Sequence, residues 1–194
     1  GTTSGGLGLL GTWEVVGTTG RWPQVVNLWE IDGWEGWARL AQRTNVDKTA
    51  NADLATWWDE AYRRRTGGFD RLLRGAPGCP TKVALQAEGV AGSWFVHELS
   101  SVRPGSGPEY LAATLAERVP VMANRGIRLV GLYDSVLTDT EVCTIWATDV
   151  ATHTSLLRDG DPWSASARRW CTRWREELMT PGPGSPLAPP EATP

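Results

Sequence analysis

The sequence has few cysteines and no closely spaced cysteine pair. Cys79, Cys143 and Cys171 are odd in number and lie far apart. This pattern argues against a disulfide framework and against a zinc site. Isolated thiols of this kind are typical of half-buried side chains in a reducing compartment. We therefore predict a cytoplasmic protein that holds no structural metal.

Other absences narrow the class of partner. No apolar run is long enough to span a bilayer, and the first six residues carry neither the basic nor the apolar part of a signal peptide. Lys and Arg number 19 against 22 Asp and Glu, so a nucleic-acid partner gains no electrostatic support. No Walker loop, GxGxxG segment, HExxH motif or nucleophile elbow occurs. We expect a small-molecule ligand, no nucleic acid and no cofactor.

Tryptophan is abundant, with twelve residues against two Phe and three Tyr. Most of these rings are expected in the core and between helices, because indole is large and mainly apolar. A few of them in one cavity would form flat walls. Such a pocket would suit a planar or polycyclic ligand.

The sequence repeats itself once. Four segments recur in the same order: Gly6–Glu14 as Gly126–Asp134, Gln24–Trp29 as Glu141–Trp146, Trp58–Arg63 as Trp170–Arg175, and Ala76–Pro80 as Gly182–Pro186. One long period indicates two copies of a small fold rather than a solenoid. We predict a first repeat over residues 1–90, a second over 91–180 and a Pro-rich tail over 181–194, extended over the surface or disordered.

The second repeat has the more complete pattern. Strands are predicted at 94–102, 127–137 and 141–147, and helices at 108–124, 149–158 and 164–179. This is the order of a ferredoxin-like unit, whose sheet carries helices on one face only. We therefore predict an α+β fold in which two such units face each other as a pseudodimeric α/β barrel, with a ligand pocket between the sheets.

The first repeat lacks a counterpart of residues 93–120. Its predicted elements are strands at 7–16 and 24–31, a helix at 33–43 capped by the Asp32 carboxylate, and a helix from Asn51 or Asp53 to Thr66. An edge strand is predicted at 81–87, and the second helix should bury Trp57, Trp58, Ala61 and Tyr62. An unpaired strand edge invites pairing. A longer N-terminus, a separate chain or a partner in a homo-oligomer is therefore expected to complete this repeat.

Several motifs resemble the NIPSNAP family of the dimeric α/β-barrel superfamily. They are Gly11–Glu14, Gln24–Trp29, Arg65–Arg71, Val96–Leu99 and Val102–Gly105. The resemblance implies a barrel of two ferredoxin-like units. It implies little about activity, because the superfamily is similar in shape but includes cofactor-free monooxygenases, polyketide cyclases, isomerases, dehydratases, haem enzymes and proteins without known catalysis.

Strand alternation selects the candidate binding residues. Leu28 and Ile145 are expected beneath helices, so the opposite face would carry a polar residue followed by tryptophan in both repeats. These residues are Asn27 with Trp29, and Thr144 with Trp146. We predict that they line the central pocket; the alternative is that they are barrel core.

Candidate catalytic residues come from the strands at 94–102 and 127–137. His97 and Glu98 are adjacent, so only one can face the pocket, where its pKa would be shifted and it could move a proton. The alternatives are an ion pair with an arginine at the barrel rim for Glu98 and a structural imidazole beneath the helix for His97. Tyr133 could donate a hydrogen bond to a carbonyl ligand, beside Trp13 at the equivalent site of the first repeat.

Two further positions are weaker candidates. Glu14 and Asp134 are equivalent by repeat and could share a proton across the pseudo-twofold axis, although solvated strand ends are the plainer interpretation. His153 lies on a predicted helix, where haem members of the superfamily commonly carry their axial ligand. A surface histidine is the alternative.

These residues favour a small-molecule enzyme that catalyses proton transfer, such as isomerisation, cyclisation or dehydration. Its substrate would be hydrophobic, aromatic or polycyclic. The alternatives are a non-catalytic ligand-binding or assembly protein on the same barrel, and a cofactor-free monooxygenase.

Overall fold

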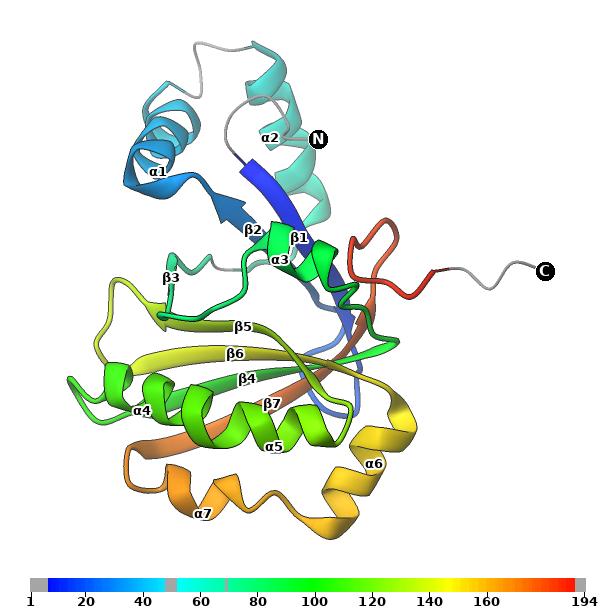
Figure 1. Ribbon diagram of the computed structural model, residues 1–194. Helices are drawn as coiled ribbons and strands as arrows, with labels where there is room; N and C mark the ends of the chain where they lie inside the picture. The colour runs from blue at the N-terminus through cyan, green and yellow to red at the C-terminus, as the bar shows by residue number, and fades with distance from the viewer. Residues whose placement is uncertain (1–6, 48–51, 69, 191–194) are drawn as a thin grey trace. The chain divides into compact units, whose positions relative to one another are not determined.

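The computed structural model describes residues 7–47, 52–68 and 70–190. It is a mixed α+β structure with one seven-stranded sheet of order β2-β1-β7-β4-β6-β5-β3 (Figure 1). In this order, every neighbouring pair from β1 onward is antiparallel. Two compact units are distinguished, Gly1–Leu9 with Trp29–Arg71 and Leu10–Leu28 with Leu72–Pro194. Among the described residues, no helix combines the length and the apolar character needed to cross a membrane.

The larger unit contains one complete ferredoxin-like motif. Its strands are β4 (Trp94–Val102), β5 (Arg128–Ser135), β6 (Glu141–Thr148) and β7 (Cys171–Pro181). They lie in the order β7-β4-β6-β5, so the first and third strands of the motif are central, as in a split βαβ arrangement. This is the strand order of the ferredoxin-like unit predicted for the second repeat, but its fourth strand, β7, lies in the segment predicted as the helix over 164–179. The pairing of two such units stays a prediction.

Helices cover one face of these strands. They are α4 (Gly107–Ala113), continued by the π-helical turn η2 (Thr114–Arg118) and by α5 (Val119–Asn124), then α6 (Val150–Asp159) and α7 (Trp163–Ala167). Figure 1 shows α4 and α5 lying along this face. The Asp149 carboxylate accepts from the Thr152 backbone N–H at 2.9 Å, which confirms the cap predicted for α6.

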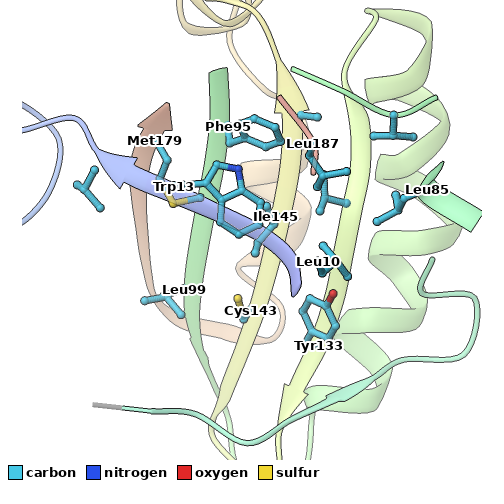
Figure 2. Close-up of a cluster of buried hydrophobic side chains, with 14 residues drawn as sticks. Leu10, Trp13, Leu85, Phe95, Leu99, Tyr133, Cys143, Ile145, Met179 and Leu187 are labelled. Carbon is cyan, nitrogen blue, oxygen red and sulfur yellow. The ribbon is translucent and has the colours of Figure 1, made fainter. Parts of the chain in front are cut away.

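A second core packs on the opposite face. Figure 2 shows Trp13 of β1 (Leu7–Val15) lying across the strands beside Phe95, Ile145 and Met179. The Trp13 and Phe95 ring centroids are 5.4 Å apart. The β2 strand (Val25–Ile31) adds Val26 and Leu28 to this core. These two residues are the repeat equivalents of Cys143 and Ile145, so the two copies present matching faces to one core.

Each copy also folds an aromatic ring over a glycine of its own strand. A Cβ added at Gly11 would collide with the Trp13 ring, and one added at Gly131 would collide with the Tyr133 ring. The spacing Gly-x-aromatic is thus a packing motif shared by both repeats. It explains why this part of the repeat is preserved in the sequence.

We expect Gly131→Ala to lower the free energy of unfolding by about 1–3 kcal/mol, because the added methyl must displace a buried ring. Gly107→Ala is the matched control, since its Cβ would meet its nearest neighbour at 3.6 Å. Urea denaturation followed by circular dichroism measures both. Equal stability of the two variants would contradict this packing argument.

The predicted helix over 164–179 is wrong. Only Trp163–Ala167 are helical, and Cys171–Pro181 form β7 between β1 and β4. The spacing of Trp170 and Trp174 suggests a helix, but Trp174 and Leu178 pack on the helix-covered face while Met179 packs in the opposite core. This period of two is that of a strand buried on both faces.

Two smaller predictions also fail in the larger unit and its tail. Residues Lys82–Ala87 form helix α3, because the Thr81 hydroxyl caps it by accepting from the Ala84 N–H at 3.2 Å. The edge strand is instead β3 (Leu73–Gly75), paired with β5. The segment after Pro181 is not confined to the surface, since Leu187 is buried in the core of Figure 2. Residues 191–194 lie outside the described residues.

The smaller unit has little buried surface. It contains α1 (Gly33–Ala41), the turn η1 (Gln42–Val46) and α2 (Ala52–Arg64). The predicted buried stripe of α2 is wrong, because Trp57 is 52% exposed and Tyr62 is 66% exposed. Asp32 precedes α1, but its side chain makes no capping hydrogen bond. Asn51, one of the predicted starts of α2, lies outside the described residues.

Candidate functional site

A buried ion-pair network lies between the sheet and the helices of the larger unit. Arg118 of η2 donates to both oxygens of Glu98 on β4, at 2.7 and 2.6 Å. It also donates to Asp161 Oδ2, at 2.8 Å from Nη2 and 3.1 Å from Nε. Arg118 and Glu98 are almost fully buried. The bidentate geometry makes this a strong, directional pair.

Two indole rings flank the Arg118 guanidinium. Its Cζ lies 5.0 Å from the ring centroid of Trp146 on β6 and 5.0 Å from that of Trp174 on β7. Both contacts are within the range of cation–π attraction. Burial acts to lower the pKa of Arg118, but the charge of Glu98 and the hydrogen bonds to it prevail and raise that pKa. Arg118 therefore stays charged.

A third carboxyl group, Glu176, lies next to this network. It is the partner of Glu98 across the β4–β7 ladder, and its Oε1 accepts from Trp174 Nε1 at 3.0 Å. Burial and then the charge of Glu98 raise the pKa of Glu176 to about 7, against opposing effects of Arg118 and Trp174. Burial and the negative charge of Glu98 thus both favour the protonated form of Glu176.

Glu176 opens onto a cleft of roughly 520 Å³. The cleft lies between α7 with its flanking loops and the first half of β7. It is lined by Asp161, Ser164, Ala167, Arg168, Cys171, Thr172, Arg173, Trp174 and Glu176. Burial also raises the pKa of the Cys171 thiol, so this thiol stays protonated at neutral pH. The cleft thus combines an aromatic wall, a neutral carboxylic acid and arginines at its margin.

Glu98 lies on the face of β4 that helices cover, paired with Arg118. The alternative stated above is an ion pair with an arginine at the barrel rim. The structure contains an ion pair with an arginine, but this pair is buried between the sheet and the helices. Its predicted role in moving protons stays a prediction, but both of its oxygens are already engaged. We therefore assign Glu98 to holding Arg118, and through it the wall of the cleft.

His97 faces the opposite side of β4. Its Nδ1 lies 3.4 Å from Glu177 Oε2, and both side chains are buried. The other oxygen of Glu177 accepts from Arg175 at 2.7 Å. His97 is thus placed away from the cleft, in a second polar cluster beneath the Thr19–Gly20 turn.

The face assignment of Trp146 and Thr144 is wrong. Trp146 packs with Met122 of α5 and Leu156 of α6, which puts its ring beneath helices. Thr144 is buried opposite Glu98 in the β4–β6 ladder. Successive side chains of β6 do alternate between the two faces of the sheet, as predicted. Cys143 and Ile145, however, face the core of Figure 2 and not the helices. Thr144 and Trp146 therefore share the helix-covered face with the Glu98–Arg118 pair.

Asn27 and Trp29 lie on the exposed face of β2. Asn27 is exposed, and Trp29 is 47% exposed. Trp146 lies beneath helices of the larger unit, so its predicted place in a central cavity is wrong. That Asn27 and Trp29 line a pocket stays a prediction. Val26 and Leu28 pack inward in their place.

Trp13 and Tyr133 are core residues. Both belong to the apolar cluster of Figure 2, where Trp13 is fully buried. Their roles as substrate-binding and catalytic residues stay predictions. Glu14 is exposed, and Asp134 forms an ion pair with Arg74, so the two carboxylates do not share an environment. His153 is buried on α6, and burial lowers its pKa while Glu98 opposes the change.

The residues that form the cleft are absent from the predictions made above. Trp174 and Glu176 lie in a segment predicted as helix, and Arg118 lies inside another. One feature of the sequence could have indicated the strand: Trp174, Glu176 and Leu178 recur at every second position, as residues on one face of a strand do. No known family model, curated protein or solved structure matches this chain.

Proposed function

We propose that this protein is a small-molecule enzyme that transfers protons on a hydrophobic, aromatic substrate bound in the cleft beside Trp174. The observation that carries the proposal is the placement of Glu176, hydrogen-bonded to Trp174 and lining the cleft next to a buried arginine. The resemblance to the NIPSNAP family and the pairing of two ferredoxin-like units remain part of this proposal. The proton transfer described below requires neither the family resemblance nor the pairing of two units.

Glu176 is suited to general acid–base catalysis. A carboxyl whose pKa is about 7 exists in both protonation states at neutral pH, which is the optimum for a group that must donate and regain a proton. In the protonated state it donates to a substrate carbonyl oxygen while water removes the neighbouring C–H proton. The resulting enol regains a proton at carbon, and the enol O–H returns its proton to Glu176. Isomerisation and dehydration share this step.

The surrounding residues position this acid. Trp174 fixes one oxygen of Glu176 through its Nε1–H, and Arg118 lies over the same indole ring. Glu98 in turn fixes Arg118 with two short hydrogen bonds. These groups are held before a ligand arrives, which is what electrostatic preorganisation requires.

We expect the protein to accelerate deuterium exchange at the acidic methylene of 2-tetralone, a bicyclic aromatic ketone, in D₂O. Glu176→Gln should reduce the protein-catalysed rate about a hundredfold or more. Because the protonated form acts, the wild-type rate above background should fall as pH rises through about 7. Proton NMR measures the exchange.

Glu88→Gln is the matched control, because Glu88 is an exposed carboxylate that pairs with Arg128 outside the cleft. It should exchange deuterium at the wild-type rate. A wild-type protein that does not exceed background, or an unchanged rate in Glu176→Gln, would contradict the proposal.

The raised pKa of Glu176 also predicts that the stability of the protein depends on pH. Its pKa is raised on folding, so its contribution to stability is complete below about 4.5 and is lost as pH rises through about 7. Glu176→Gln should flatten the dependence of the unfolding midpoint on pH over this window, and Glu88→Gln should not. Parallel slopes in the two variants would show that Glu176 titrates normally.

A non-catalytic ligand-binding or assembly protein is the second candidate. The observation that favours it is the exposure of several large aromatic side chains outside the cleft, among them Trp22, Trp34 and Trp57. Exposed apolar surface of this kind is typical of contact sites. Binding of an aromatic ligand in the cleft without any exchange activity would support this candidate over the first.

A further inference from the structure

The first half of β7 has an open edge. On one side β4 pairs with β7 from Cys171 to Met179, but on the other side β1 pairs only with Met179–Pro181. Figure 1 shows the first half of β7 at the border of the sheet, with β1 beside only its far end. In the part of the chain that the structure describes, no strand pairs with residues 172–176 on this side.

The alternation of the backbone shows which groups reach this edge. Leu178 directs both of its backbone groups away from β4, because its C=O accepts from the Val16 N–H at 2.8 Å and its N–H donates to Thr19 Oγ1 at 2.9 Å. Residues two apart in an antiparallel strand direct their backbone groups to the same edge. The backbone groups of Trp174 and Glu176 therefore also face away from β4, and within the described residues they have no hydrogen-bond partner.

The cleft follows this open edge. Its lining includes Trp174 and Glu176, whose side chains lie on the helix-covered face, and Arg173, which the β4–β7 register places on the opposite face. A depression that touches both faces of one strand runs along the edge of that strand. The cleft therefore leaves the backbone groups of Trp174 and Glu176 accessible to an extended chain.

The face of β7 opposite Trp174 carries positive charge. Arg173 and Arg175 both lie on it, and their ladder partners on β4, Ser101 and Leu99, are uncharged. Arg175 pairs with Glu177 at 2.7 Å. Arg173 is exposed and forms no ion pair within the described part of the chain. One arginine on this face is therefore available to an acidic side chain of an added strand.

The helix-covered side of the same edge differs. Its charged groups are Arg118 and Arg168 against Glu98, Asp161 and Glu176. This side offers no excess of positive charge to an acid, and the indole of Trp174 offers a broad apolar face. An added strand is therefore expected to place an apolar or aromatic residue here.

We propose that the open edge of β7 binds an extended, alternating acidic and aromatic segment of a partner protein by adding it to the sheet as a strand. Its backbone would hydrogen-bond with Trp174 and Glu176, its aromatic side chains would enter the cleft beside Trp174, and its acidic side chains would face Arg173 and Arg175. Backbone pairing of this kind provides affinity, and alternate side chains provide specificity. The inference goes beyond the proposed function and does not depend on it.

A second copy of this chain fits the edge poorly. If the open edges of two copies pair in antiparallel, Arg173 of one copy lies opposite Arg175 of the other, or the two Arg175 side chains lie opposite each other. Like charges that lie directly opposite each other destabilise a sheet. The same arginines therefore oppose self-pairing and favour an acidic partner.

Fluorescence anisotropy with the labelled peptide Phe-Glu-Phe-Glu tests the inference. We expect the wild-type protein to bind it about tenfold more tightly than Phe-Lys-Phe-Lys, because of the charge of Arg173, and about tenfold more tightly than the unalternated Phe-Phe-Glu-Glu. Methylation of both Phe backbone nitrogens should lower the affinity by a similar factor, because those N–H groups would donate to β7.

Arg173→Glu should abolish or reverse the preference for the acidic peptide. Arg128→Glu is the matched control and should bind like the wild type, because Arg128 is an exposed arginine outside the cleft. Both side chains are exposed, and circular dichroism checks that the variants fold. Equal affinity for the acidic and lysine peptides, no binding of either, or affinity unchanged by methylation would overturn the inference. A wild-type dimer in analytical ultracentrifugation that excludes the peptide would overturn it in favour of self-pairing.

This inference and the proposed function fail separately. Peptide binding that depends on Arg173, without catalysed exchange of 2-tetralone, would support the strand site while overturning the proton-transfer function. Exchange that depends on Glu176, without peptide binding, would overturn only the strand site. If both hold, the acidic peptide should inhibit the exchange, because its aromatic side chain and 2-tetralone would occupy the same place beside Trp174.

Discussion

Arg118→Leu is expected to lower the free energy of unfolding by about 3–5 kcal/mol, the largest loss expected from any charged residue here. The substitution leaves the buried Glu98 carboxyl without its two hydrogen bonds and its counter-charge, and it removes the partner of Asp161. It also removes the cation held between Trp146 and Trp174. Urea denaturation monitored by circular dichroism measures the loss.

Two further variants separate the lost pairing from lost packing. Arg118→Leu/Glu98→Leu should recover a large part of the stability, because no unpaired buried charge remains. Arg128→Leu is the matched control, since its pair with Glu88 is exposed and such pairs contribute about 0–1 kcal/mol. If the double variant is no more stable than Arg118→Leu, burial of the Glu98 charge does not dominate, and the network matters mainly through its packing.

Trp13→Ala is expected to cost about 3–5 kcal/mol of unfolding free energy, because the ring is fully buried and its removal leaves a large cavity. Its neighbours Phe95 and Met179 come from two different strands, which limits their collapse into that space. Thermal and urea unfolding provide the measurement.

Trp29→Ala provides the matched contrast. Trp29 is the same residue type and is 47% exposed, so its removal should cost about 1 kcal/mol or less. The sequence by itself ranks Trp29 with the pocket residues and would give it the larger effect. A cost for Trp29→Ala as large as that for Trp13→Ala would therefore restore the buried position predicted for Trp29 and contradict the structure.

The repeat is the part of the fold that the sequence determined best. The Gly-x-aromatic segments at Gly11–Trp13 and Gly131–Tyr133 adopt the same local packing, and the following strands send Val26, Leu28, Cys143 and Ile145 to one core. These features depend on neighbours a few residues apart, so local pattern is sufficient to find them. The cap of α6 by Asp149 is predictable for the same reason.

Which face of each strand meets the helices was decided only by the tertiary structure. Alternation separates Ile145 from Trp146 but does not say which one lies beneath a helix. The choice comes from Arg118, which is distant in sequence and must reach Glu98 across the helix–sheet interface. Thr144 is the ladder partner of Glu98, and Trp146 lies two residues further along β6, so both side chains lie on the helix-covered face.

The identity of β7 was decided in the same way. Its segment carries tryptophans at helical spacing and many charged residues, which locally favours a helix. It becomes a strand because β4 pairs with it from Cys171 to Met179 and β1 pairs with its last residues, Met179–Pro181. Arg175, Glu176 and Glu177 also each find a partner there. The candidate cleft depends on this strand. The sequence alone therefore determined the repeated folding pattern and its core spacing, and only long-range pairing determined where the acid, the indole and the arginines come together.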